Sequence, residues 1–469
     1  MEKNKEKFGD SIVKQIFVRD RAFYRTMVRL SLPAALQALL SLMVMLADNV
    51  MISRYDAAFL APVSQANSIS TFVIAALNGL GSGAVVLVSQ YWGKKDHTAI
   101  KRVFSVAAAM GLTVAVLCIL MIQLIPETVV SLVLDPELKS LTPVAVSYLR
   151  IACLSFLPFG FTSALVGGLK GVEVVKVTLF AAVISLLSNV VLNALLIFGF
   201  GPIPTLGVEG AAIATVLARV IELAVVWLYC FHRQKALSIQ PKDLLHHEKW
   251  AWKDYLRFGG PVGFTDAQWA LVGLMKMSII GHLGATMMSA VNITDTMMNL
   301  GTMFTFALAG GACVMVGKAV GQKDMEKVHA YIRTIQALFA IIGVVMAGIV
   351  ILLRLPFISL YGQTADAVKL ADTLIFIGAI TLMGTSYHAS CFVGINRGAG
   401  DNRFVMLVDL ICGWLVVLPL TYLTAFVLPI PEGIKLPVVF LCTRIDQCFK
   451  WIIAFIRLRG KKWIKQVTR

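Results

Sequence analysis

The sequence predicts an all-α integral membrane protein with 12 transmembrane helices, arranged as two pseudo-symmetric six-helix bundles around a central cavity. Three observations support this prediction: an apolar composition, a series of apolar runs long enough to cross a bilayer, and a duplication within the chain. Of the 469 residues, 58% are hydrophobic and 14% are charged, whereas a soluble domain usually has about 25% charged residues. Most of the chain is therefore expected to lie in the membrane.

The apolar stretches, separated by short polar segments, have the length that a helix needs to cross the hydrocarbon core, about 20 residues. We expect twelve spans, near residues 28–54, 61–91, 102–125, 142–169, 177–199, 207–231, 255–281, 288–317, 328–353, 370–396, 404–428 and 436–456. The polar and basic residues before the first span contain no apolar segment typical of a cleavable signal peptide. The first span is therefore expected to start membrane insertion.

The net charge of +16 is better explained by topology than by nucleic-acid binding. Most of the 42 Lys and Arg residues fall in the two terminal segments and in alternate loops. Loops rich in Lys and Arg stay in the cytoplasm and so set the orientation of the spans. We expect a multi-pass protein of the cell membrane with both termini cytoplasmic, whose basic segments contact membrane lipids.

The chain contains an internal duplication. When it is shifted by 228 residues, Arg29–Asp96 aligns with Arg257–Asp324 without a gap, and 15 of these 68 positions are identical. The identical residues include Pro, Gly and charged residues, which an apolar composition alone does not place in register. The predicted division is an N-lobe at 1–235, a cytoplasmic linker at 236–254 and a C-lobe at 255–469, and two such lobes are typical of transporters that rock around a central site.

Several kinds of chemistry are not indicated. The eight cysteines form no CxxC pair and no His/Cys cluster with metal-ligand spacing. The sequence also lacks a phosphate-binding loop of the GxxxxGKS type. We therefore expect no cofactor, no enzymatic activity and no direct use of ATP.

One predicted site lies in the N-lobe. Asp48 lies six residues before Arg54 at the outer end of the first span, which is about 9 Å at 1.5 Å per residue. The residues expected at a similar depth are Asn189, Asn193 and Thr215. A carboxylate with amide and hydroxyl oxygens can hold a proton or bind a small cation such as Na⁺. The alternative is a carboxylate that only stabilises helix packing.

A second predicted site lies in the C-lobe. The residue that corresponds to Asp48 there is Lys276, and the one that corresponds to Asn67 is Asp295. Both lie at a similar depth, so we expect an ion pair between the seventh and eighth spans. This pair is either a structural clamp or a part of the substrate cavity that cargo can open, and the predicted cavity residues are Gln37, Asn67, Lys276 and Asp295.

Six segments in order resemble the multidrug and toxic compound extrusion (MATE) transporters over essentially the whole chain. They are LPAALQALLSLMVMLADNVMISRY (32–55), GSGAVVLVSQYWGKKD (81–96), YLRI (148–151), NVVLNALLIFG (189–199), GVEGAAIAT (207–215) and RGAGD (397–401).

The resemblance implies export of amphipathic, often cationic compounds, driven by inward Na⁺ or H⁺. It also implies that Asp48, Asn189 and Thr215 match the family's cation-coupling residues, and that the first helix bends at Pro33. Many members have Asp where this chain has Asn193, which leaves the coupling ion open.

The predicted function is therefore an H⁺- or Na⁺-coupled antiporter that exports cationic drugs or toxic metabolites, acting as a monomer on small-molecule substrates. Two alternatives remain open. One is a flippase for lipids or lipid-linked oligosaccharides, a function found in the wider superfamily, and the other is a membrane scaffold that transports nothing.

Overall fold

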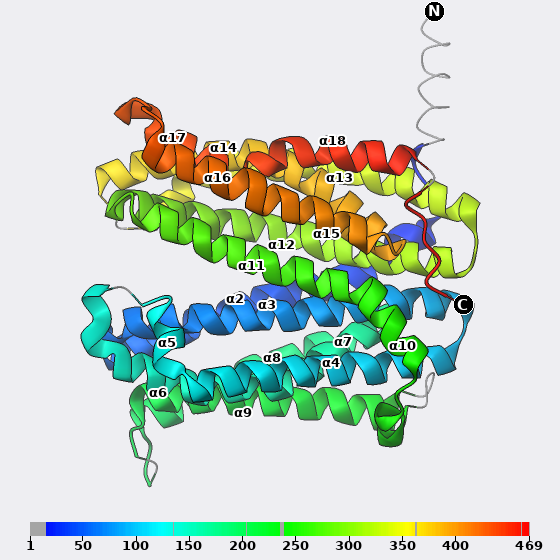
Figure 1. Ribbon diagram of the computed structural model, residues 1–469, viewed down its shortest axis with the longest axis horizontal. Coiled ribbons are helices and arrows are strands. Elements are labelled where there is room, and N and C mark those ends of the chain that lie inside the picture. The colour runs from blue at the N-terminus through cyan, green and yellow to red at the C-terminus, as the bar shows by residue number, and fades with distance from the viewer. Residues whose placement is uncertain are drawn as a thin grey trace, which may run out of the picture. The chain divides into compact units, whose positions relative to one another are not determined.

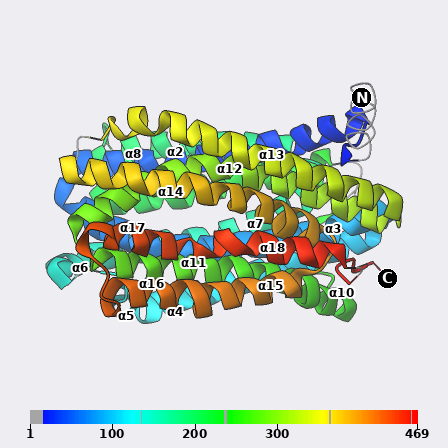
Figure 2. The ribbon, with the colours of Figure 1, turned by 90° about the horizontal axis from the view of Figure 1, so that it is seen from above.

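The computed structural model describes residues 16–134, 136–202, 204–234, 239–361, 364–460 and 462–468, without the side chains of 136–138. The regular elements of these residues are all helices (Figures 1 and 2). The first half of the chain contains α2 (Arg21–Tyr55), α3 (Ala57–Lys94), α4 (His97–Leu124), α5 (Pro126–Ser131), α6 (Thr142–Ala152), α7 (Phe156–Gly171), α8 (Lys176–Phe198) and α9 (Gly207–Leu228). The second half contains α10 (Lys249–Asp254), α11 (Gly260–Gly281), α12 (Ala285–Gly321), α13 (Met325–Ile358), α14 (Ala365–Ala389), α15 (Asn402–Leu410), α16 (Leu418–Tyr422), α17 (Glu432–Thr443) and α18 (Ile445–Arg459).

Ten helical stretches of the described residues are long and apolar enough to cross a membrane, and they coincide with ten of the twelve expected spans. The other two expected spans differ in character. The expected seventh span is helical over Gly260–Gly281 but carries Asp266 and Lys276, which lower its hydropathy. The expected twelfth span is divided at Arg444 into α17 and α18. The charge of Lys276 inside the seventh span was expected, whereas the break in the twelfth span was not.

The chain forms two compact units whose boundaries fall inside helices. One unit is 36–270, and the other combines the residues up to Ala35 with those from Leu271 onward. The first boundary lies in α2, two residues after Pro33, and the second lies in α11. The start of each of these helices is therefore grouped with the other half of the chain, whereas the lobes at 1–235 and 255–469 stay a prediction.

Close helix packing defines unit 36–270. In this unit α3 packs on α7, and α8 packs on α9. A Cβ atom at Gly167 would lie 2.1 Å from the carbonyl oxygen of Gly81, so the backbones of α3 and α7 meet where only glycine fits. The Tyr255 hydroxyl donates to the Leu80 carbonyl at 2.6 Å, which joins the segment before α11 to α3.

Each unit contains a close contact between a second span and the start of a first span, made by different residues in the two units. A Cβ atom at Gly311 on α12 would lie 2.4 Å from Ser31 Oγ on α2. In unit 36–270 a Cβ atom at Gly83 on α3 would lie 2.7 Å from the carbonyl oxygen of Gly259. Gly83 and Gly311 are equivalent in the duplication, and so are Ser31 and Gly259. The contact between a first span and a second span is therefore duplicated along with the sequence.

The duplicated turns also have the same backbone geometry. Lys95 has φ 63° and Lys323 has φ 61°, and each is followed by an aspartate that caps the next helix. The carboxylate of Asp96 accepts from the backbone N–H of Ala99 at 3.0 Å, and Asp324 does the same with Lys327. The left-handed residue in each turn is thus a lysine, and Gly93 and Gly321, two residues earlier, are helical.

The segment that precedes α10 is attached to α4. Asp243 pairs with Lys101 at 3.1 Å, and Ser105 donates to the Leu244 carbonyl at 2.7 Å. Partial burial raises the pKa of Asp243, but the backbone N–H of Gln240 and the charge of Lys101 outweigh it and hold the pKa below its ordinary value. This part of the predicted linker is ordered against a helix, while 235–238 lie outside the described residues.

Candidate functional site

Asp48 is held by α8. The side-chain amide of Asn193 donates to Asp48 Oδ1 at 2.5 Å and to Asn189 Oδ1 at 3.2 Å. Asn189 and Asn193 lie one turn apart on α8 and are 2% and 0% exposed. Asp48 itself is half-buried. Three of the four residues predicted for the N-lobe site therefore lie together inside one compact unit.

Thr215, the fourth, is positioned differently. Its hydroxyl donates to the Ala211 carbonyl of its own helix at 3.0 Å, and the residue is half-buried on α9. Because α8 packs on α9, Thr215 belongs to the same helix pair as Asn189 and Asn193. The hydroxyl of Thr215 therefore makes its hydrogen bond within α9 and not to the carboxylate of Asp48.

The side-chain amide oxygen of Asn193 receives no hydrogen bond from the described residues. This atom, Oδ1, is buried. Leaving a buried acceptor unpaired costs about 1–3 kcal/mol. A second donor or a cation beside Asp48 would remove this cost.

Two further ionisable residues lie near Asp48, where sequence reasoning did not place them. Arg219 and Tyr148 lie close enough to interact with its charge. Arg219 pairs with Glu222 at 2.7 Å, as their spacing on one helix predicts, and lies over the Phe159 ring. The segment YLRI contains Tyr148, but nothing in its sequence pattern indicates a neighbour on α2.

The other residues predicted for the cavity in unit 36–270 make local contacts. The carbonyl of Gln37 accepts from the Ser41 hydroxyl, and its Oε1 is buried without a donor among the described residues. The carbonyl of Asn67 on α3 accepts from the Thr71 hydroxyl. Pro33 lies inside α2, which is a continuous helix through this position. The cavity role of Gln37 and Asn67 and the bend at Pro33 stay predictions.

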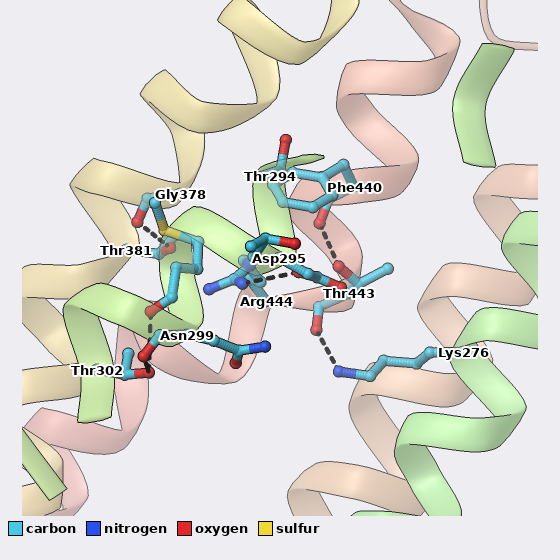
Figure 3. A network of polar contacts seen from close by, with 12 residues as sticks. Lys276, Thr294, Asp295, Asn299, Thr302, Gly378, Thr381, Phe440, Thr443 and Arg444 are labelled. Carbon is cyan, nitrogen blue, oxygen red and sulfur yellow. Dashed lines mark hydrogen bonds and ion pairs between the residues drawn. The ribbon is translucent and has the colours of Figure 1, made fainter. Parts of the chain in front are cut away.

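The ion pair predicted between Lys276 and Asp295 is replaced by another pair. Asp295 pairs with Arg444 at 3.2 Å, while Lys276 Nζ donates to the Thr443 carbonyl at 3.5 Å (Figure 3). Arg444 lies at the break between α17 and α18, where its backbone leaves the helical conformation. The sequence gives no sign that the twelfth span breaks there. It therefore could not show that Arg444, and not Lys276, is the ion-pair partner of Asp295.

A second charged cluster lies in the same unit and was also missed. Lys450 pairs with Asp409 at 2.8 Å and with Asp446 at 2.9 Å, and the side chains of Lys450 and Asp446 are 2% and 1% exposed. Asp446 and Lys450 are one turn apart on α18, a visible signal, but Asp409 comes from α15. The cluster explains why Asp409 is tolerated inside a span.

Known protein families and structures share features with this chain. The MatE family model matches residues 33–195 and, a second time, residues 261–423. The chain belongs to the MatE family. The two matches begin and end 228 residues apart, so the MATE unit is present twice at the shift found in the sequence, and the first match contains Asp48, Asn189 and Asn193.

Curated relatives match most of this MATE chain. "Uncharacterized transporter YisQ" of Bacillus subtilis is 25% identical over 90% of this chain and 90% of its own. "Probable multidrug resistance protein NorM" of Halalkalibacterium halodurans is 26% identical over 82% of this chain and 84% of its own. The protein is therefore a multi-pass membrane protein of a transporter family.

Solved structures show the same fold. The eukaryotic MATE transporter AtDTX14 matches with a TM-score of 0.83 at 17% identity, covering 95% of this chain and 97% of its own. An outward-facing multidrug resistance MATE transporter of the MOP superfamily matches with a TM-score of 0.81 at 20% identity, covering 92% and 95%. The fold class predicted from the sequence, twelve transmembrane helices in two lobes, is confirmed.

Proposed function

We propose that the protein is an H⁺- or Na⁺-coupled antiporter that exports amphipathic, cationic drugs or toxic metabolites by alternating access. The observation that carries the proposal is the contact of Asp48 with Asn193 inside the membrane-spanning part of unit 36–270. An ionised carboxylate in a bilayer costs about 2.5–3.5 kcal/mol. Occupancy of this group by a proton or Na⁺ therefore changes the stability of the conformation that contains it.

The chemistry of the site suits either ion. Ionised Asp48 accepts a hydrogen bond from the amide nitrogen of Asn193, whereas protonated Asp48 could donate to Asn193 Oδ1, the buried acceptor that has no donor among the described residues. Na⁺ would instead be bound by hard oxygen ligands from Asp48, Asn189 and Thr215. In the proposed cycle, the outward-open protein takes up the ion at Asp48, ion occupancy disfavours cargo binding, and release of cargo outside is followed by reorientation of the ion-bound protein, which carries the ion inward.

The test is efflux of a cationic dye from membrane vesicles, with the proton and sodium gradients imposed separately. Asp48→Asn removes the charge that the ion neutralises while keeping the shape of the side chain. Site-to-site coupling is typically worth 1–3 kcal/mol, so gradient-driven efflux should fall about 5- to 150-fold. Asp366→Asn, at an exposed carboxylate in the first turn of α14, is the matched control. Undiminished efflux by the Asp48→Asn protein would refute the proposal.

The names of the NorM relatives, "probable multidrug resistance protein", support drug export over the alternatives. A lipid-flipping assay on the same vesicles separates export from the flippase, and any gradient-dependent flux excludes a scaffold. The proposal also includes the cell membrane as location, cytoplasmic termini and a monomer that binds no nucleic acid.

A further inference from the structure

We propose that Arg444 and Lys276 form a subsite for an acidic group, a carboxylate, on cargo that this protein binds. The proposal rests on the proposed function, because it assumes a small-molecule cargo, and it narrows that cargo to amphiphiles that carry a negative group in addition to any positive one.

The first argument is charge balance in a single compact unit. Lys450 is held by two carboxylates, Asp409 and Asp446, in a buried cluster. Arg444 and Lys276 lie in the same network, and the carboxylate that contacts Arg444 directly is Asp295 (Figure 3). Three cations of this unit, Lys276, Arg444 and Lys450, are matched by three carboxylates, but two of those carboxylates pair with Lys450. The partner of Arg444 is the exposed side chain of Asp295, so an anion can approach Arg444 without displacing a buried partner.

The second argument is exposure within a membrane helix. The side chain of Asp295 is 42% exposed, in a 37-residue helix that is long enough to span the bilayer. Asn292 and Asn299, three residues before and four residues after Asp295, are also exposed, and this spacing places all three on one face of α12. A charged and amide-lined face directed at hydrocarbon would be expensive. We infer that this face contacts water or a polar ligand.

The third argument is the break between α17 and α18. Arg444 has φ −125° and ψ 11°, so the α-helix is interrupted at this residue, and the carbonyl of Thr443 just before it accepts from Lys276. Discontinuous helices in transporters commonly mark binding sites, because they expose backbone polar groups and aim side chains inward. The guanidinium also lies over the buried Phe440 ring, 5.4 Å from its centroid, which limits its motion.

The guanidinium has the geometry for the ligand. Arginine offers five N–H donors in a planar fork that matches a carboxylate, and Nη2 is the atom that reaches Asp295. A carboxylate on cargo could bind the same fork beside or in place of Asp295, with Lys276 adding a second positive charge. A basic group on the same cargo would then form an ion pair with Asp295.

The test compares two dyes that differ in one group: rhodamine 110, which has a free carboxylate, and rhodamine 123, its methyl ester. Their binding to the purified full-length protein is measured by fluorescence polarisation. A charged hydrogen bond is worth about 1.5–3 kcal/mol, so Arg444→Gln should weaken binding of the acid by about tenfold or more. Lys276→Gln should weaken it in the same direction, and neither variant should weaken binding of the ester. In contrast, Asp295→Asn should strengthen binding of the acid, because it removes the carboxylate that competes for Arg444.

Lys435→Gln is the matched control, since Lys435 lies on the same α17 but nine residues before Arg444, about 13 Å along a helix. If binding of the acid responds to neither Arg444→Gln nor Lys276→Gln, or weakens in Asp295→Asn, the subsite is wrong. Gradient-driven efflux of rhodamine 123 is measured separately. If that efflux occurs while the acid shows no response, only the subsite fails; if affinities respond without any efflux, the antiporter proposal fails.

Discussion

Lys450 shows how a single residue can determine whether charges are tolerated inside a span. Its ammonium group lies between the carboxylates of Asp409 and Asp446, and it is almost fully buried. Replacing one partner of a buried ion pair leaves an uncompensated charge, which typically costs about 3–5 kcal/mol. This residue therefore contributes to stability regardless of what is transported.

We predict that Lys450→Met lowers the free energy of unfolding by about 3–5 kcal/mol, because two carboxylates lose their shared counter-ion. Thermal unfolding of the purified protein in detergent measures the change. The triple variant Lys450→Met, Asp409→Asn, Asp446→Asn should recover most of the loss, and Lys435→Met should have little effect. A single variant as stable as the unmodified protein would contradict the prediction.

At the scale of elements, the equivalent turns of the two halves share an unusual backbone conformation. Lys95 and Lys323 adopt the left-handed conformation, which costs a non-glycine residue about 1–2 kcal/mol. Asp96 and Asp324 compensate by capping the helices that follow. A second pair shows the same feature, because Glu173 has φ 64° and Gly400, 227 residues later, has φ 84°. Glycine is present in only one of these four turn positions.

We predict that Lys95→Gly and Lys323→Gly each stabilise the protein by up to about 1 kcal/mol, since relief of about 1–2 kcal/mol of strain at positive φ exceeds the entropic cost of glycine, about 0.5–1 kcal/mol. Asp96→Ala and Asp324→Ala should each destabilise it by about 1 kcal/mol through loss of the cap. The melting temperature of the four variants measures these effects. Lys94→Gly, one residue earlier in the helical conformation, is the control and should destabilise the protein. Opposite signs for the two halves would show that the turns are not energetically equivalent.

For the whole molecule, orientation in the membrane follows from the distribution of Lys and Arg. The family match supports a multi-pass transporter, and the proposed orientation has both termini in the cytoplasm. Reporter fusions measure it directly. A green fluorescent protein fused to either end should fluoresce, whereas alkaline phosphatase fused to either end should be inactive. An active phosphatase at one end only would mean an odd number of spans.

The sequence by itself determined the membrane class, the duplication and the positions of the helices, because these depend on composition, apolar length and register. It also indicated that Asp48 and the two asparagines on α8 share a depth, since helical rise converts spacing into distance.

Only the tertiary structure decided which partner each charge takes. Asp295 pairs with Arg444 because α17 ends at Thr443, and Lys450 joins Asp409 because α15 and α18 lie together. Depth along a helix can be counted from a sequence, but the direction of a side chain around the axis and a break in a span depend on packing between distant segments. Those interactions determine the partners.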